Sequence, residues 1–506
     1  MAPRRTIVED LGSNSFRLVV YEWEPGLWWR RVDELHETVR IGAGLDSDGV
    51  LGRKGIERGL RAVELFAHVR ESFGIPIEET LAVATSAIRD AANGGEFVKQ
   101  AEAVGGAPVR LLSTAEEARY GMLAAVNSTT LSDGWTLDLG GGSMQLCRVE
   151  GRRSKRCGSW PLGAVRMTEH YLADGGPASR KAIKDLTKHA VSTLRSDGIE
   201  ADGGRVVGIG GAVRNLAQAA RIEAELPSLG TQGFELTAGA LDELIDRLAA
   251  LPAAKRRDVP GIKPGRGEII LAAAVVLRAA LEATGVDSIE TTEAGLREGV
   301  FFERFLAPAD PPLFPDVRGA SVRNLALQHR LDVGHAERVA DLALGMFDSL
   351  RETEAKPGGA KLRELLWAAA MLHDVGKAID YDDHHRHSKY LILGAGLPGY
   401  TQRELALTAL MARYHRKGNP DPNGLAGLLE PGDLERLRRC SALLRLAEFL
   451  ERGRDGAVES AALVPNGKGI KLELSVRGNA ALAVWGAERQ ADAFAAAFGS
   501  ELIVRP

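Results

Sequence analysis

Two copies of one short pattern constrain this 506-residue chain more than any other feature. Residues 7–20 read IVEDLGSNSFRLVV, and residues 135–149 read WTLDLGGGSMQLCRV. Each copy is an apolar strand that ends near an aspartate, a tight turn of small residues, and a second apolar strand. Glycine in such a turn lets consecutive backbone N–H groups point at one anion, and aspartate at a strand end can hold Mg²⁺ beside it. The repeat therefore predicts a duplicated fold that grips a phosphate chain between its halves.

The repeated pattern also assigns roles to its residues. Asp10 and Asp138 are the candidate Mg²⁺ ligands. The turns supply candidate phosphate contacts, namely Gly12, Ser13, Asn14, Ser15, Arg17, Gly140, Gly141, Gly142 and Ser143. A third glycine turn, GIGGAVRNLA at 208–217, adds Gly210 and Gly211, because a strand followed by a glycine turn and a helix start again presents N–H groups to an anion.

Arginines beside predicted turns are candidate phosphate ligands. Arg89 follows a predicted strand at 80–85, and Arg166 and Arg297 lie in glycine-containing turns. A guanidinium can place two donors on phosphate oxygens, a geometry that lysine cannot match. The alternative for each is a solvent-exposed surface arginine, and the sequence does not separate the two.

Glu117 has two interpretations. Thr114-Ala-Glu-Glu117 matches a helix capping box, in which the glutamate accepts a backbone N–H. A glutamate at the start of a helix beside Mg²⁺ and phosphate could instead deprotonate a water for attack on phosphorus. Spacing alone favours the cap.

Composition and charge exclude several classes of protein. A formal net charge of −4 argues against non-specific nucleic-acid binding. Three cysteines without a CxxC pair argue against a disulfide framework or a zinc ribbon, which fits a reducing cytoplasm. Glu9 and Asp10 interrupt any signal-peptide core, and the longest uncharged apolar run, 269–277, is too short to span a bilayer. We expect a cytoplasmic protein without a membrane segment.

The order of predicted elements defines four regions. Strand and helix patterns alternate through 1–130 and 131–306, which predicts two α/β lobes. Four prolines in 307–315 (APADPPLFP) predict a linker. Residues 316–455 show apolar spacing typical of helices, and 456–506 have the pattern of a small α+β domain.

The motifs of the first half resemble the exopolyphosphatase / guanosine-pentaphosphate phosphohydrolase (Ppx/GppA) family, a branch of the actin-like superfamily. The resemblance rests on DLGSNSFRL, ATSAIRDA, EEARYG, LDLGGGS, PLGAVRMTE, GIGGAVRNLA and AGLREGV, in the family's order. It implies two actin-like (ribonuclease H-like) lobes, Mg²⁺-dependent release of a terminal phosphate, and inorganic polyphosphate or guanosine pentaphosphate as substrate. It also implies that Glu117 is the catalytic base, Asp138 a metal ligand and Arg89 a phosphate contact.

Two positions depart from the family's pattern. The second loop commonly continues Ser-Thr-Glu, whereas this chain has Met144 and Gln145, which removes a negative charge near the metal. Ala212 replaces a hydroxyl residue in the third glycine turn.

The helical half contains a second candidate metal site. LWAAAMLHDVGK at 366–377 resembles the HD superfamily of metal phosphohydrolases, whose pattern is a His, a His-Asp pair and a distant Asp. The candidate ligands are His335, His373, Asp374, His387, His415 and Glu448. Imidazole and carboxylate suit Mn, Fe, Ni or Zn. The alternative is a helical HD-like scaffold without metal, because glutamate stands where the superfamily usually has aspartate.

These observations predict an exopolyphosphatase in which Glu117 is the general base. The alternatives are a guanosine pentaphosphate phosphohydrolase, a sugar-kinase-like phosphotransferase, and a sensor that binds phosphate chains with slow turnover. We expect a homodimer with no specific nucleic-acid partner.

Overall fold

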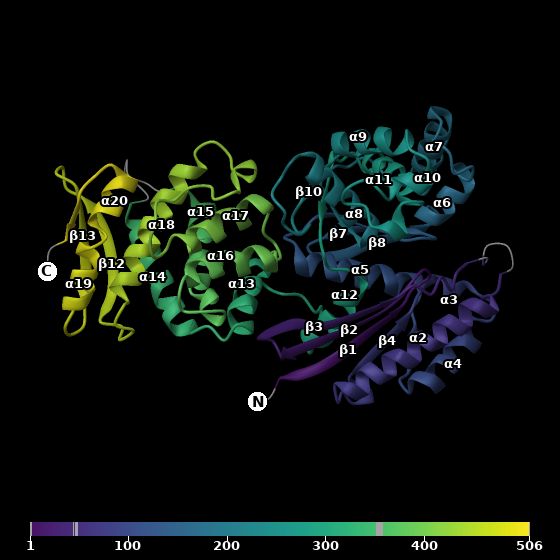
Figure 1. Cartoon of the computed structure of the whole chain (residues 1–506), viewed down its shortest axis with the longest axis horizontal. Helices are drawn as coiled ribbons and strands as arrows, with labels where there is room; N and C mark the ends of the chain where they lie inside the picture. The colour runs from purple at the N-terminus through teal and green to yellow at the C-terminus, as the bar shows by residue number, and fades with distance from the viewer. Residues whose placement is uncertain (1–2, 44, 46–48, 351–357, 505–506) are drawn as a thin grey trace. The chain divides into compact units, whose positions relative to one another are not determined.

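The computed structural model describes residues 3–43, 45, 49–350 and 358–504, which form two compact units. Unit 1 comprises the described residues of Met1–Ala224 and Thr231–Val317, and unit 2 comprises those of Glu225–Gly230 and Arg318–Pro506. Figure 1 shows mixed sheets and helices in unit 1 and mainly helices in unit 2.

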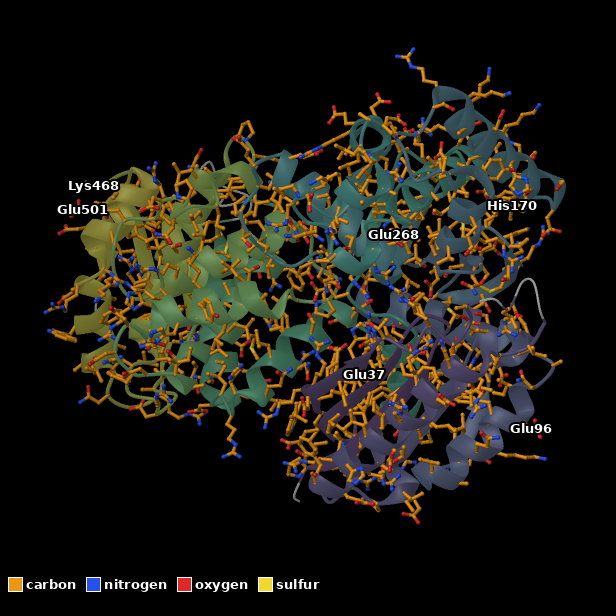
Figure 2. All side chains as sticks on the ribbon, turned by 45° about the vertical axis from the view of Figure 1, so that its right-hand side comes forward. Glu37, Glu96, His170, Glu268, Lys468 and Glu501 are labelled. Atoms are coloured by element: carbon orange, nitrogen blue, oxygen red, sulfur yellow. A yellow bond between two sulfur atoms is a disulfide. The ribbon has the colours of Figure 1, made fainter. Side chains whose placement is uncertain are left out.

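The exterior of each unit is polar. Figure 2 shows charged side chains over the surface, with Glu96 and Glu268 exposed in unit 1 and Lys468 and Glu501 exposed in unit 2. None of the helices in the described part of the chain is both long and apolar enough to cross a bilayer.

Unit 1 contains the same sheet topology twice, which confirms the predicted duplication. The first sheet has the order β3-β2-β1-β4-β5, and the second has β10-β11-β9-β6-β7-β8. In each, an antiparallel meander is followed by two parallel strands, and β10 is an additional edge strand in the second. The strands of the first sheet are β1 (Arg4–Leu11), β2 (Phe16–Glu24), β3 (Trp28–Glu37), β4 (Thr80–Ala84) and β5 (Val109–Leu111). Those of the second are β6 (Gly134–Leu139), β7 (Met144–Glu150), β8 (Arg153–Trp160), β9 (Arg205–Ile209), β10 (Glu235–Thr237) and β11 (Ser288–Thr291).

The helices of unit 1 follow the strands in alternation, as the sequence pattern predicted. Those of the first lobe are α2 (Arg53–Ser72), α3 (Ser86–Asp90), α4 (Gly94–Gly105) and α5 (Thr114–Ser128). Those that follow are α6 (Ala164–Tyr171), α7 (Arg180–Ser196), α8 (Gly210–Glu223), α9 (Ala238–Ala249), α10 (Ala253–Arg256), α11 (Ile270–Thr284) and α12 (Leu296–Phe305).

Helix α5 lies between the two sheets and packs against one face of each. Its Leu123 packs with Val8 of β1 and with α12, while its Met122 packs with Ile209 of the second sheet. Side chains alternate along a strand, so Asp10 shares the face of Val8. The opposite face of this sheet packs against α2 and α4.

The second sheet obeys the same alternation. Leu137 and Leu139 of β6 belong to the core formed with α7 and α11. Asp138, between them, therefore points to the opposite face, where α5 lies. The fold thus directs both repeated aspartates toward one helix.

The proline-rich segment 307–315 has no regular secondary structure, but it is attached to unit 1. The Asn127 side chain donates to Pro312 O (2.9 Å) and accepts from Phe314 N (2.9 Å). A proline carbonyl accepts hydrogen bonds like any other, so donors from α5 can hold the segment in place.

The expectation that the cysteines form no disulfide is wrong. Cys147 and Cys157 are joined by a disulfide between β7 and β8. They lie directly opposite one another in the antiparallel pair, which brings their Cβ atoms close. A search for CxxC pairs cannot find this disulfide, because its two cysteines are ten residues apart. The number and spacing of the cysteines therefore no longer support a reducing compartment. Cys440 is buried and free.

Unit 2 has one hydrophobic core to which both its helices and its strands contribute. The helices are α13 (Val317–Gln328), α14 (Val333–Ser349), α15 (Ala360–Leu372), α16 (His384–Ala395), α17 (Gln402–Arg413), α18 (Asp433–Leu450), α19 (Ala481–Glu488) and α20 (Ala491–Phe498). A three-stranded sheet contains β12 (Val458–Pro465), β13 (Ile470–Val476) and β14 (Leu502–Val504), and β12 packs against α14.

Candidate functional site

The ends of β1 and β6 and the first turn of α5 bring three carboxylates together. Asp10 pairs in register with Arg17 across the first hairpin. Asp138 lies against α5, because a Cβ atom on Gly121 would be 3.9 Å from Asp138 Oδ2. Gly121 is one helical turn after Glu117 on α5, so the Asp138 carboxylate lies about one turn along this helix from Glu117.

The capping interpretation of Glu117 is wrong, because the helix begins one residue earlier than the motif suggested. Ser113 is the N-cap: its Oγ accepts from Glu116 N (3.2 Å), and Glu116 Oε2 accepts from Ser113 N (2.9 Å). Glu116 therefore completes the capping box. The Glu117 side chain is left for another role.

Arg89 holds the Glu117 carboxylate. Its Nη1 donates to Glu117 Oε2 at 2.9 Å and to Leu112 O at 3.1 Å, and its Nε donates to Asp90 at 3.0 Å. The two side chains of the ion pair are each less than a fifth exposed. Arg89 is therefore not a freely solvated surface arginine.

Burial of negative charge raises the pKa values of all three carboxyls. Burial, together with the nearby Glu117 and Asp10, raises the pKa of Asp138 to about 6. Burial likewise raises the pKa of Glu117, while Arg89 lowers it. The Asp10 pKa is raised by burial and lowered by Arg297 and Arg17. Each carboxyl retains some solvent contact, so the site is recessed rather than sealed.

Four arginines surround these carboxylates, and the sequence interpretation missed two of them as site residues. Arg17 and Arg297 come from the first hairpin and α12, and Arg214 and Arg266 come from α8 and the segment before α11. Burial, together with Arg17 and Arg214, lowers the pKa of Arg266 to about 10. Arginines that repel one another within reach of carboxylates are typical of sites that bind oxyanions. Arg214 was visible in GIGGAVRNLA, one helical turn after Gly210.

The third glycine turn closes on Asp138. Gly210 has φ +93°, and a Cβ atom there would be 2.8 Å from Asp138 Oδ1. Glycine is therefore required for both its backbone conformation and its space. A Cβ on Gly211 would collide with the Arg266 guanidinium, so Gly211 lies against a site cation.

The first hairpin turn is tied to neighbouring elements. Ser13 Oγ lies 3.0 Å from Ser86 Oγ and accepts from Ala87 N (3.3 Å), which joins the turn to α3. Asn14 O accepts from Val39 N and Arg40 N at 3.2 and 2.8 Å. A Cβ atom on Gly12 would be 3.0 Å from Ser15 O and 3.6 Å from Asp10 Oδ1, so the turn passes close to the Asp10 carboxylate.

The second turn is braced by α6. Gly140 N donates to Ser143 O at 2.9 Å inside the turn, so this N–H is used by the protein. The carbonyls of Gly140, Gly141 and Gly142 accept from the first N–H groups around the start of α6. Arg166 belongs to that first turn of α6, and its backbone N–H approaches Gly141 O at 3.4 Å.

The two departures from the family's pattern lie in this region. Gln145 is the cross-strand partner of Asp138, is buried, and donates to Ser143 Oγ at 3.2 Å. Its amide stands where a carboxylate would face Asp138. Ala212 is buried at the start of α8 and supplies no polar side-chain group.

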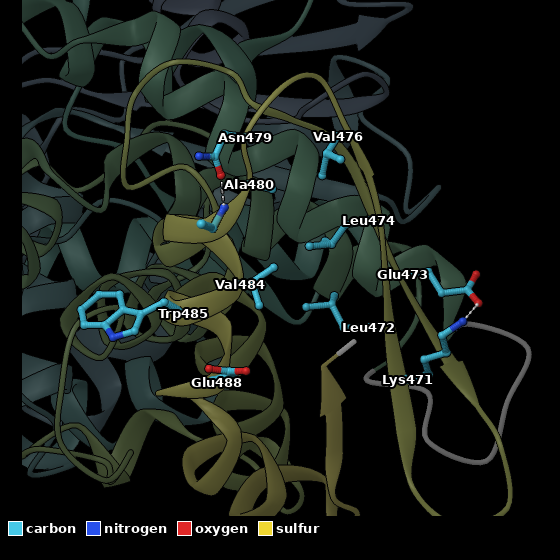
Figure 3. Close-up of a pocket in the computed structure, with 11 residues that line it drawn as sticks. Lys471, Leu472, Glu473, Leu474, Val476, Asn479, Ala480, Val484, Trp485 and Glu488 are labelled. Atoms are coloured by element: carbon cyan, nitrogen blue, oxygen red, sulfur yellow. Dashed lines mark hydrogen bonds and ion pairs between the residues drawn. The ribbon is translucent and has the colours of Figure 1, made fainter. Parts of the chain in front are cut away.

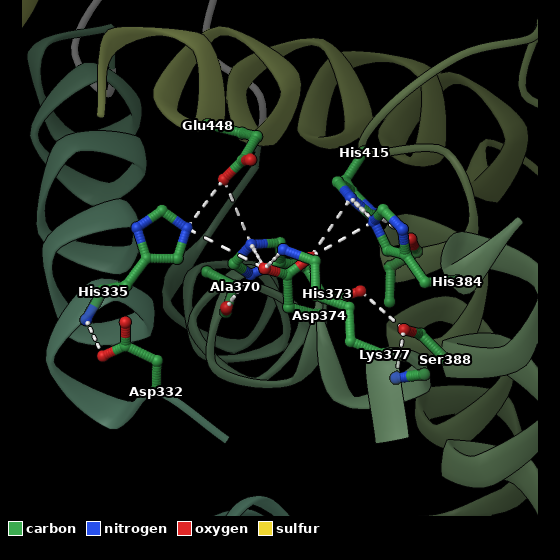
Figure 4. Close-up of polar contacts among 12 residues, drawn as sticks. Asp332, His335, Ala370, His373, Asp374, Lys377, His384, Ser388, His415 and Glu448 are labelled. Carbon is green, nitrogen blue, oxygen red and sulfur yellow. Dashed lines mark hydrogen bonds and ion pairs between the residues drawn. The ribbon is translucent and has the colours of Figure 1, made fainter. Parts of the chain in front are cut away.

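Unit 2 contains a separate cluster of histidines and carboxylates, shown in Figure 4. Two sets of three residues have ligand atoms within 4.8 Å of one another, and Asp374 belongs to both. The sets are His335, His373 and Asp374, and Asp374, His384 and His415. Glu448 Oε2 joins the first set, at 3.0 Å from His335 Nε2 and 3.2 Å from His373 Nε2. Burial, together with the neighbouring His373, lowers the pKa of His415 to about 3.

The prediction of His387 as a ligand is wrong, and His384 takes its place. Both residues lie on α16, but they are three positions apart, and only His384 Nε2 reaches Asp374 Oδ1 (3.2 Å). The start of α16 decides this outcome, because the helix begins at His384 with Asp383 in a left-handed conformation. Residue spacing without the helix boundary could not identify which histidine points inward.

An open apolar pocket in unit 2 is not a candidate for this chemistry. It has a volume of about 940 Å³ and lies between β13 and α19, where Leu472, Leu474, Val484 and Trp485 line it (Figure 3). Two charged residues of its lining, Lys471 and Glu473, are exposed and form an ion pair with each other, with 3.0 Å between Nζ and Oε1. Convergent catalytic groups are absent from this lining.

Comparison with known proteins identifies the class of the chain. Its residues 19–307 match the model of the Ppx/GppA phosphatase family, and residues 317–483 match that of Ppx/GppA phosphatase domain III. The chain belongs to the Ppx/GppA phosphatase family. Within that family it is a member that carries the third domain in addition to the phosphatase region.

Solved structures agree with this assignment. The Aquifex aeolicus family member has a TM-score of 0.52 and 25% identity, and the match covers 59% of this chain and 96% of that one. An exopolyphosphatase-like protein has a TM-score of 0.53 and 25% identity, with 60% and 99% covered. An exopolyphosphatase from Cytophaga hutchinsonii is similar in fold, with a TM-score of 0.54 and 17% identity over 60% and 98% of the two chains.

Proposed function

We propose that the chain is an Mg²⁺-dependent exopolyphosphatase that removes the terminal phosphate of inorganic polyphosphate between two actin-like lobes. The observation that carries the proposal is the gathering of Glu117, Asp10 and Asp138 at the start of α5, with four arginines around them. Carboxylates for metal and base, together with guanidinium groups for oxyanions, are the set that phosphoryl transfer requires.

The donor chemistry fits Mg²⁺. Asp10 and Asp138 offer hard carboxylate oxygens, and their pKa values are raised because they hold negative charge in a recessed place. A divalent cation favours the charged form of both carboxyls and so removes this cost. When bound, Mg²⁺ would supply charge neutralisation at the transferring phosphoryl group.

In the proposed reaction, Glu117 accepts a proton from the attacking water. The water oxygen bonds to the terminal phosphorus, the bridging P–O bond breaks, and the electron pair leaves with the shortened chain. Arg89 positions the Glu117 carboxylate through its hydrogen bond, and burial keeps that carboxylate basic. Arg214 and Arg266 would neutralise the phosphoryl oxygens.

Guanosine pentaphosphate is the alternative substrate, because its end is the same phosphoanhydride. The family name covers both activities, and the gathered carboxylates and arginines would meet only the phosphate oxygens that the two substrates share. A cytoplasmic location and a homodimer stay predictions.

Glu117→Gln provides the test, and the neighbouring Glu116→Gln is its matched control. Both variants lose one charge in the same helical turn. We expect Glu117→Gln to lower kcat on polyphosphate by about 10²–10⁴-fold, because a positioned general base contributes that much. Glu116→Gln loses the same charge but keeps a side chain that can complete the capping box, so it should keep kcat and lose at most about 1 kcal/mol of stability.

Phosphate release is measured from polyphosphate, from guanosine pentaphosphate and from ATP with a sugar acceptor, at saturating Mg²⁺. Equal kcat values for the two variants would refute the role of Glu117. A much higher kcat/KM for guanosine pentaphosphate than for polyphosphate would show that guanosine pentaphosphate is the preferred substrate. Tight polyphosphate binding without release by the wild-type chain would favour a sensor.

A further inference from the structure

The histidine cluster of unit 2 has a fixed pattern of protons. The Nδ1 atoms of His373, His384 and His415 lie 2.6, 2.8 and 2.7 Å from the backbone carbonyl oxygen three residues earlier. A carbonyl oxygen can only accept, so each Nδ1 must carry the proton. In the neutral ring the Nε2 atom then carries a lone pair, and these three lone pairs point into the cluster.

In neutral rings, the Nε2 atoms of His373, His384 and His415 are inward-facing acceptors. His384 Nε2 lies 3.1 Å from His415 Nε2 and 3.2 Å from Asp374 Oδ1. Among the described residues, His373 Nε2 and Asp374 Oδ1 are buried without a hydrogen-bond partner. Buried acceptors at such distances repel one another unless a cation lies between them.

Asp374 divides the cluster into two sets through its two oxygens. Its Oδ2 faces His335 and His373 at 4.0 and 3.6 Å, and its Oδ1 faces His384 and His415 at 3.2 and 3.9 Å. One carboxylate oxygen for each set is the arrangement of a bridging ligand. Figure 4 shows Asp374 between the two groups of imidazoles, with Glu448 above the first.

The rim of the cluster is basic. Lys377 and Arg454 both contact Asp374 Oδ2, the latter at 3.3 Å, and Arg452 approaches Glu448 Oε1 at 3.7 Å. These side chains are 27%, 42% and 48% exposed, whereas the histidines are buried. An anion approaching from solvent would therefore meet cations at the edge of the cluster.

We propose that unit 2 holds two divalent transition-metal ions bridged by Asp374, and that their open positions bind a phosphoryl oxyanion. His335, His373 and Glu448 hold one ion, and His384 and His415 hold the other. Mixed imidazole and carboxylate donors suit Mn, Fe, Co, Ni or Zn rather than Mg. Lys377, Arg452 and Arg454 turn to the oxyanion when metal replaces them beside the carboxylates.

This centre is separate from the proposed exopolyphosphatase site and does not rest on it. Its chemistry differs as well, because the unit 1 site is built from carboxylates and guanidinium groups, and the unit 2 cluster is built mainly from imidazoles.

The experiment compares His384→Ala with His387→Ala in the full chain. Both substitutions remove a histidine from α16, but only His384 belongs to the cluster. After incubation with Mn²⁺ or Zn²⁺ and removal of free metal, we expect about two ions for each wild-type and His387→Ala chain, and about one for His384→Ala. Asp374→Asn should bind neither ion tightly. Metal content is measured by mass spectrometry, and folding by circular dichroism.

A second readout follows the oxyanion. Titration with inorganic phosphate should give a binding event in the metal-loaded wild-type and His387→Ala chains that is lost in His384→Ala. His415→Gln, which keeps side-chain volume, should repeat the result if His384→Ala unfolds unit 2. Clearly fewer than about two ions for each wild-type chain, or equal metal content in the two α16 variants, would overturn the proposal. Metal binding without a phosphate response would remove its oxyanion part.

Discussion

The two units of this chain gather charged and metal-binding groups by different means. In unit 1, strand ends and the first turn of α5 supply carboxylates, and arginines from four separate elements surround them. In unit 2, imidazoles and carboxylates face one another, with the imidazole protons turned away toward backbone carbonyls. In unit 1, Arg89 pairs directly with Glu117. In unit 2, Lys377, Arg452 and Arg454 contact the carboxylates from the rim, while Nε2 atoms of neutral imidazoles face one another inside.

This difference indicates how each site depends on metal. Arginines lie near the unit 1 carboxylates, and burial raises the pKa values of Asp10 and Asp138, so protonation can take the place of a cation there. They suit an ion that is bound weakly and exchanged with substrate. The unit 2 cluster suits ions that are bound tightly as part of the fold. Variants in one unit should therefore leave the metal behaviour of the other unchanged.

Asp138→Asn should have the largest effect, and it should be confined to unit 1. We expect kcat on polyphosphate to fall on the order of 10³-fold, because a metal ligand at the transferring phosphoryl group contributes several kcal/mol. The transition-metal content of unit 2 should not change. Phosphate release and metal content, measured on the same preparation, test the two expectations. If the variant lowers both kcat and metal content, the two sites are not independent.

The same variant should be more stable than wild type at neutral pH without Mg²⁺. The Asp138 pKa is raised from 3.8 to about 6, so the folded state resists ionisation that the unfolded state allows. Wild-type stability from this group is therefore lost as pH rises through about 4 to 6. Above pH 6, Asp138→Asn should gain roughly 1–3 kcal/mol, and below pH 4 it should gain nothing. Denaturant unfolding at pH 4 and 7 tests this, and a gain equal at both pH values would contradict the cause.

Sequence patterns predicted the parts of unit 1 that depend on local chain chemistry. The two Asp-Leu-Gly turns, the duplicated α/β order and the position of Glu117 at the start of α5 are all encoded within short segments. Arg214 was visible in its motif but Arg266 was not, because the approach of Arg266 to Asp138 depends on how β9, α8 and the segment before α11 pack. The cap was misassigned by one residue, and that single shift changed which glutamate was available.

The histidines of unit 2 illustrate a different limit. Composition and the His-Asp pair predicted a cluster, and His335, His373, Asp374, His415 and Glu448 do converge. The choice between His384 and His387 depends on where α16 begins, because two side chains three residues apart differ by only about 60° in direction and about 4.5 Å along the helix axis. Likewise, the Cys147–Cys157 disulfide depends on strand register rather than on spacing.

Arg266→Gln should have an intermediate effect on unit 1. Loss of one charge-assisted contact to phosphate should raise KM for polyphosphate by about 10–30-fold, with a smaller change in kcat. Its pKa of about 10 keeps Arg266 charged at neutral pH, so the wild-type contact is fully present. Arg257→Gln is the matched control, because Arg257 is exposed and pairs with Asp258 at 3.9 Å.

Initial rates over a range of polyphosphate concentrations measure the effect. The ratio of KM values between Arg266→Gln and Arg257→Gln should shrink as salt rises, because salt screens the attraction between arginine and polyanion. Equal KM values for the two variants would remove Arg266 from the site.

Gln145→Glu should have the smallest effect, and it sharpens the contrast between exchangeable and tightly held metal. The introduced carboxylate would face Asp138 across the β6–β7 pair, where Gln145 now donates to Ser143 Oγ. This added carboxylate should lower the Mg²⁺ concentration for half-maximal activity by about 3–10-fold, since each added ligand charge strengthens binding of a hard cation.

The added carboxylate should also raise the Asp138 pKa further, because like charges disfavour ionisation. The variant should therefore lose stability without Mg²⁺ and regain it when Mg²⁺ is added. Activity and thermal unfolding across a Mg²⁺ titration measure both effects, and an unchanged or higher Mg²⁺ requirement would place the ion away from this strand pair.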